Sequence, residues 1–189
     1  AGPEFLFIIE EQPKTIAAGE IFASPDLELA TRLSLFLWSS FPDDELLEIA
    51  SAGKLKNSRV LNQQVKRMLD DPRSDALLTN FALQWLNLGR LNTAAPDAEL
   101  FPYFNDSLRQ AFRTETEMFL NYVIKEDRPL LELLEADYTF VNERLAEHYG
   151  IPDIRGSHFR RVKLPDRNRG GLLGQSSVLT ITSYANRTS

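Results

Sequence analysis

The sequence predicts an all-α fold: a compact array of several helices, with a short N-terminal arm and a small irregular or β segment near the C-terminal end. Across residues 24–155, apolar residues recur at spacings of three and four, which is the period of one helix face. Proline, glycine, aspartate and asparagine residues divide these stretches where helices are expected to begin and end. Residues 1–23 are predicted to be an arm and linker, and residues 156–189 the beginning of a second, truncated module.

Four helices are expected in the first half of the chain, and their short connections favour a compact antiparallel array. A loop with two prolines and no apolar period follows them at residues 89–102. The expected helices cover residues 25–41, 43–52, 57–69 and 74–88.

The second half is predicted to contain one long helix at residues 106–126, a helical turn at 130–134 and a shorter helix at 140–149 that a glycine ends. Residues 158–164, HFRRVKL, alternate in polarity and are basic, which favours an exposed edge strand or arm.

A glycine-rich run at residues 170–175, GGLLGQ, leads into the last expected helix. Its backbone N–H groups could hold an anion. However, the run lacks the G-K-[ST] of a P-loop and the preceding strand and spacing of a dinucleotide fingerprint. Close packing of the last helix is the simpler interpretation of the glycines.

The composition is that of a globular domain, since 43% of the 189 residues are hydrophobic and 25% are charged. A net charge of -6 at pH 7 argues against a nucleic-acid partner, which would require a basic face. No apolar stretch is long enough to span a bilayer, and the first residues lack the basic and apolar regions of a signal peptide.

The chain contains no cysteine and two histidines. Within these residues this excludes disulfides, thiolate zinc sites, iron–sulfur clusters, a cysteine nucleophile and covalent haem attachment through C-x-x-C-H. Two histidines also argue against a histidine-rich metal site. We therefore expect no metal and no cofactor within this chain.

Glu115 is the most informative single position, because it falls in the middle of the apolar face of the long predicted helix. A buried carboxylate must be paired or hydrogen-bonded, since an isolated buried charge costs several kcal/mol. Glu115 could form a structural ion pair, act as a general base or ligand at the floor of a pocket, or lie exposed at a gap between helices.

Two residues of the segment DYTFVNERLAEHYGI are candidates to act with Glu115. Arg144 is the expected partner of a buried carboxylate because its planar fork matches carboxylate geometry. His148 is either a packing histidine or an acid–base group or ligand. Neither a G-x-S-x-G elbow nor an H-E-x-x-H helix is present, so no motif supports an enzyme claim.

Five segments carry a family resemblance: DLELATRLSLFLWSSFPDDELLEIA, MLDDPRSDAL, NFALQWL, DYTFVNERLAEHYGI and GGLLGQSSVLTITSYANRTS. In this order they resemble the large planctomycete-type secreted proteins that combine c-type cytochrome modules with several domains of unknown function. The resemblance implies one helical domain of unknown function followed by the first part of the next. It also implies export to the periplasm or cell surface, a c-type haem module elsewhere in the polypeptide, and other domains of that polypeptide as partners.

Three functions remain open on the sequence alone. The first is an accessory, binding or scaffolding domain of an exported cytochrome-associated protein. The second is part of a redox or hydrolytic active site built around Glu115, Arg144 and His148. The third is a protein–protein interaction module, for which the apolar arm at residues 4–9 and the basic segment at 158–164 are the best candidates.

Overall fold

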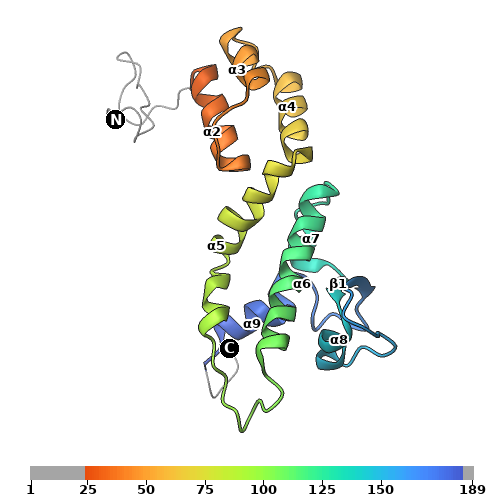
Figure 1. Ribbon diagram of the computed structural model, residues 1–189. Helices are drawn as coiled ribbons and strands as arrows, with labels where there is room; N and C mark the ends of the chain where they lie inside the picture. Colours follow the sequence, from red (N-terminus) through yellow and green to blue (C-terminus); the bar gives the residue numbers. More distant parts are fainter. Residues whose placement is uncertain (1–23, 185–189) are drawn as a thin grey trace. The chain divides into compact units, whose positions relative to one another are not determined.

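The computed structural model describes residues 24–184 and divides the chain into two compact units, residues 1–73 and 74–189 (Figure 1). The predicted N-terminal arm, including its apolar stretch at residues 4–9, lies outside the described residues.

In its described part, residues 24–73, unit 1 has three α-helices, and α3 connects α2 to α4 (Figure 1). An aspartate side chain at the start of α3 and an asparagine side chain at the start of α4 accept hydrogen bonds from backbone N–H groups, as the sequence predicted. The helices are α2 (Asp26–Trp38), α3 (Asp44–Ser51) and α4 (Ser58–Asp70).

Trp38 ties α2 to α4 within unit 1. Its indole N–H donates a hydrogen bond of 2.8 Å to the carbonyl oxygen of Met68, and both side chains are buried. The guanidinium of Arg73 lies 3.5 Å from the centre of the Trp38 ring system, so the outer side of the ring carries a cation–π contact.

Unit 2 is built on α6 (Asp106–Lys125), a helix of 20 residues with its apolar face buried. Two core clusters lie along this face, one around Phe112 and one around Phe119. The other elements are η1 (Pro72–Ser74), which spans the division between the units, η2 (Leu77–Ala82), α5 (Leu83–Trp85), η3 (Leu88–Thr93), α7 (Glu132–Glu135), β1 (Tyr138–Val141), α8 (Glu143–Tyr149), β2 (Arg160–Lys163), η4 (Leu172–Gly174) and α9 (Ser176–Thr182).

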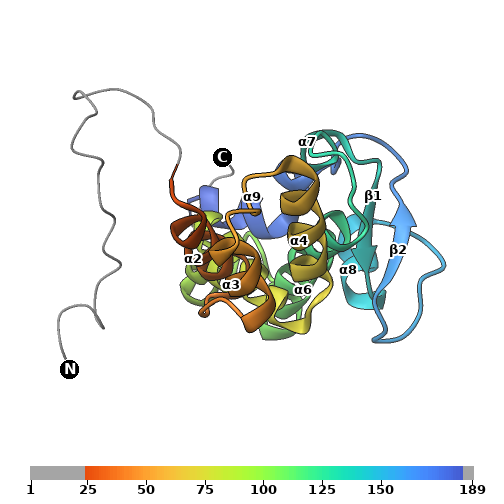
Figure 2. The same cartoon turned by 90° about the horizontal axis from the view of Figure 1, so that it is seen from above.

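A small antiparallel sheet replaces the first turn of the helix expected at residues 140–149. Strand β1 pairs with β2, and Tyr138 lies opposite Lys163 (Figures 1 and 2). Helix α8 begins only after Asn142, whose side chain accepts the backbone N–H of Leu145 at 3.0 Å. The predicted helix start was therefore wrong by three residues. Of the two alternatives for residues 158–164, an edge strand or an arm, the structure has the strand, β2.

The glycine-rich run allows two close backbone approaches. Gly171 has φ +61°, and a Cβ built on it would lie 2.5 Å from the carbonyl carbon of Leu134. A Cβ on Gly174 would lie 2.5 Å from the carbonyl carbon of Arg169. The glycines therefore allow close packing, as predicted. The prediction that they pack against the last helix is wrong, because their close neighbours are Leu134 and the residues before η4.

The all-α prediction with a small β segment is confirmed. The fourth expected helix, residues 74–88, belongs to unit 2 and contains one stretch of π-helix, η2. Residues 156–184 also belong to unit 2, because β2 pairs with β1 and α9 packs against α6. None of the described helices is long and apolar enough to cross a membrane.

Candidate functional site

Glu115 lies at the centre of a buried polar network in unit 2. Its side chain is 0% exposed. The hydroxyl of Thr139 on β1 donates to Oε1 at 2.5 Å, and the hydroxyl of Tyr149 at the end of α8 donates to Oε2 at 2.6 Å. Glu115 thus joins α6, β1 and α8, and both carboxylate oxygens have a donor.

The network continues from Tyr149 to α9. The backbone N–H of Ser176 donates to the Tyr149 hydroxyl oxygen at 2.9 Å. Arg169 covers the Tyr149 ring, with its guanidinium carbon 4.8 Å from the ring centre, and its Nη1 donates to Ser176 Oγ at 3.2 Å. Two hydrogen bonds therefore link the buried carboxyl group to Ser176.

Burial raises the pKa of Glu115 to about 7 from its ordinary 4.5. The hydrogen bonds from Thr139 and Tyr149 and the positive charge of Arg169 act in the opposite direction. Burial and the neighbouring Glu115 raise the pKa of Tyr149 well above its usual 10.0, so this phenol stays protonated. At neutral pH the carboxyl group of Glu115 is close to the midpoint of its titration.

A second buried polar cluster lies beside the first. The hydroxyl of Thr116 donates to Gln175 Oε1 at 2.7 Å and shares a hydrogen bond of 2.5 Å with Ser177 Oγ. All three side chains are almost completely buried. The start of α9 is therefore fixed to α6 by side-chain hydrogen bonds as well as by apolar packing.

The predicted pair between Glu115 and Arg144 is wrong. Arg144 donates from Nη2 to the carbonyl oxygen of Tyr103 at 2.7 Å, and its closest carboxylate is that of Glu147 at 3.9 Å. The first turn of α8 faces the loop before α6, whereas the last residue of α8 reaches Glu115. The charge that acts on Glu115 is that of Arg169.

His148 is a ring-packing residue at the edge of the network. Its ring centre lies 5.0 Å from that of Phe112 and 5.6 Å from that of Tyr149. Desolvation of the ring against these neighbours, followed by the charges of Arg169 and Arg144, lowers the pKa of His148 to about 4. The imidazole is therefore neutral at physiological pH.

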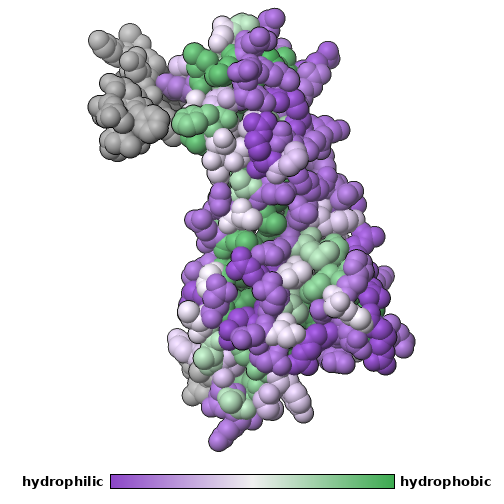
Figure 3. All heavy atoms as spheres, in the orientation of Figure 1, coloured by the Kyte–Doolittle hydropathy of each residue, from purple (hydrophilic) through white to green (hydrophobic). Residues whose placement is uncertain are grey.

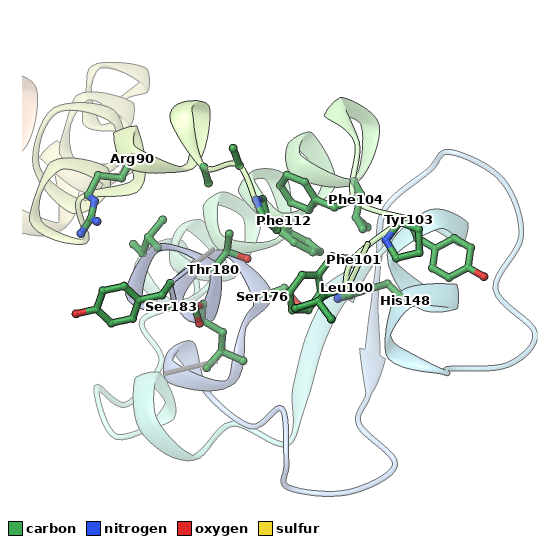
Figure 4. A pocket seen from close by; sticks show the side chains of 18 of the residues that line it. Arg90, Leu100, Phe101, Tyr103, Phe104, Phe112, His148, Ser176, Thr180 and Ser183 are labelled. Carbon is green, nitrogen blue, oxygen red and sulfur yellow. The ribbon is translucent and has the colours of Figure 1, made fainter. Parts of the chain in front are cut away.

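A cavity of about 680 Å³ opens beside His148 (Figure 4). The loop before α6 forms one side of it, and α9 forms the other. Most of its lining is apolar, including Phe101, Phe104 and Phe112. Its polar wall carries His148, Ser176 and Arg169, so the network around Glu115 lies directly behind this wall.

The site residues that sequence reasoning missed are Thr139, Tyr149, Arg169 and Ser176. Tyr149 follows His148 in the aromatic segment and shares its side of the helix, which was a usable signal. Arg169 and Ser176 flank the glycine-rich run, and nothing local marks them as partners of α6. Within residues 24–184, no group of three or more histidine and acidic side chains is placed to hold a metal ion.

Comparison with known families decides the classification. Residues 25–151, about two thirds of the chain, match a family model described as "Protein of unknown function (DUF1592)". The chain belongs to this family. No curated protein and no solved structure matches the chain significantly.

The DUF1592 match runs from the start of α2 to the residues just after α8. It includes Glu115 and both of its hydroxyl donors, Thr139 and Tyr149. Arg169 and Ser176 follow the matched DUF1592 region, although they complete the polar wall of the cavity. The candidate site therefore combines DUF1592 residues with residues beyond them.

Proposed function

We propose that this chain is an accessory domain that binds a small molecule in the cavity of unit 2. The observation that carries the proposal is the cavity itself, which has a volume of about 680 Å³ and a mostly apolar lining whose polar side chains include His148, Arg169 and Ser176. Small-molecule sites are typically concave and mostly apolar, with volumes of about 300–1,000 Å³ and a few placed polar groups.

The wider setting of this domain is also proposed. The five segments quoted above support a place in a large exported protein, in the periplasm or at the cell surface, with a c-type haem module elsewhere in the polypeptide. The partners would then be the other domains of that polypeptide. We propose no cofactor within this chain.

Binding receives more support than catalysis because the three candidate catalytic residues do not converge. Glu115 is sealed from solvent, Arg144 is held by the carbonyl oxygen of Tyr103, and of the three only His148 lines the cavity. A general base must reach the proton that it removes, either directly or through one water. Glu115 has no such access in this arrangement.

An interaction module receives less support as well. Such a module would expose a large continuous apolar patch. The face shown in Figure 3 is mostly polar, and its apolar residues appear in separate groups. Leu130 and Leu131, just before α7, and Leu134, within it, are exposed.

A titration with the neutral fluorescent probe N-phenyl-1-naphthylamine tests the binding proposal. We expect saturable, single-site binding that Leu179→Trp weakens by at least about tenfold, because Leu179 lines the cavity and an indole would fill it. The matched control is Leu173→Trp, at a leucine that is 61% exposed and outside the cavity. Binding that is absent, or equal in both variants, would contradict the proposal.

A further inference from the structure

We propose that the ligand of the cavity is an amphipathic organic acid: Arg169 binds its carboxylate, and the aromatic lining holds its apolar body. This inference rests on the proposed function, because it names the chemical class of ligand for the same cavity. Three features of the described residues carry it: the contacts of Arg169, the charges around the cavity and the position of the apolar side chains.

Arg169 lines the cavity, and only one of its guanidinium N–H donors is used by a hydrogen bond among the described residues. Its guanidinium uses Nη1 for Ser176 Oγ at 3.2 Å and rests on the Tyr149 ring. Among the residues that the structure describes, no carboxylate oxygen lies within 4.0 Å of a guanidinium nitrogen of Arg169. A guanidinium has five N–H donors in a planar fork, which matches a carboxylate through two parallel hydrogen bonds.

The charges around the cavity favour a single negative charge on the ligand. Arg169 is the cation of the polar wall, while His148 is neutral at physiological pH. Glu115 lies behind the wall, within electrostatic reach of Arg169. Two further charged residues, Arg90 and Glu99, are exposed and of opposite sign. A phosphate dianion bound at Arg169 would therefore find no second cation on the polar wall, whereas a monocarboxylate is matched.

The apolar body has a defined place beside this charge. Phe101 and Phe104 from the loop and Phe112 from α6 lie close to His148, and Arg90 lies apart from them (Figure 4). Leu179 and Ile181 of α9 complete the lining. Each methylene that a ligand buries there should raise its affinity about fourfold.

Competition between two ligands of equal chain length tests the inference. Octanoate and 1-octanol are each used to displace N-phenyl-1-naphthylamine from the whole chain. We expect octanoate to displace the probe at a concentration at least about tenfold lower than octanol, and Arg169→Gln to abolish that preference. Arg90→Gln is the matched control, and it should keep the preference because Arg90 lies away from the polar wall.

The outcomes separate this inference from the proposed function. Equal displacement by octanoate and octanol in the unmodified chain, or a preference that survives Arg169→Gln, would overturn the carboxylate assignment and leave the cavity a binding site. If the neutral probe does not bind, the proposed function fails, and this inference fails with it. The octanoate–octanol comparison in the unmodified chain holds even if Arg169→Gln does not fold.

Discussion

The stability of unit 2 is expected to fall by about 3 kcal/mol as the pH rises from 4.5 to about 7, because of Glu115. In the folded chain burial raises the pKa of this carboxyl group to about 7, whereas the unfolded chain has the ordinary value of 4.5. Between these values the folded state holds a proton that the unfolded state has lost. The stabilisation is therefore fully present below pH 4.5 and is lost as the pH rises through about 7.

Glu115→Gln should remove this pH dependence, because an amide of nearly the same size carries no charge at any of these pH values. We expect the variant to resemble the unmodified chain at pH 5 and to be more stable than it at pH 8, by up to about 3 kcal/mol. Urea unfolding followed by circular dichroism at both pH values measures the difference.

The control for Glu115→Gln is Glu117→Gln, the same substitution two residues further along α6. Glu117 forms a half-buried i,i+4 ion pair with Arg113 at 2.8 Å, and such helix pairs contribute only about 0.3–0.5 kcal/mol to stability. Its variant should show no difference in pH dependence. If Glu115→Gln destabilised the chain equally at pH 5 and pH 8, Glu115 would be ionised throughout, and the account of its burial would be incorrect.

The second large effect is expected at Gly171. Replacement by alanine should destabilise unit 2 by about 2–6 kcal/mol, because two costs of roughly 1–3 kcal/mol each add. The first is the backbone conformation, φ 61° and ψ -175°, a region that is essentially restricted to glycine. The second is the Cβ itself, which would lie 2.5 Å from both the carbonyl carbon and the oxygen of Leu134.

Gly89→Ala is the matched control for Gly171→Ala. Nothing lies within 4 Å of a Cβ at Gly89, and its φ is not positive, so we expect a change within about 1 kcal/mol. Thermal unfolding of the two variants side by side measures the contrast. Similar melting temperatures for both would mean that the backbone of Leu134 moves away at little cost, which contradicts the close approach seen here.

The helices that the sequence predicted best are those whose signals are local. The limits of α3, α4 and α6 follow from apolar periodicity and from the side chains that cap their first turns, and these depend only on neighbouring residues. Strand β1 was missed because its four residues, YTFV, are compatible with either structure. Pairing with a segment about twenty residues away makes them a strand.

The candidate site shows the same division between local and tertiary information. Periodicity alone placed Glu115 on the buried face of α6, and the structure agrees. Its partners could not be found in this way, because Thr139, Tyr149 and Arg169 come from three other segments. Arg144 was chosen from its chemistry and its place on α8, but helix position does not say which side of α8 meets α6.

The most direct test of the account is a methyl NMR titration of the labelled chain with N-phenyl-1-naphthylamine. Binding in the cavity predicts saturable shifts that are largest at the methyl groups of Leu100, Leu179 and Ile181, which line it. Leu47 in unit 1 and Leu173 on η4, both exposed and outside the cavity, should not shift. Shifts spread evenly over exposed leucines, or no saturable shift at the lining residues, would contradict the claim that unit 2 is a ligand-binding domain.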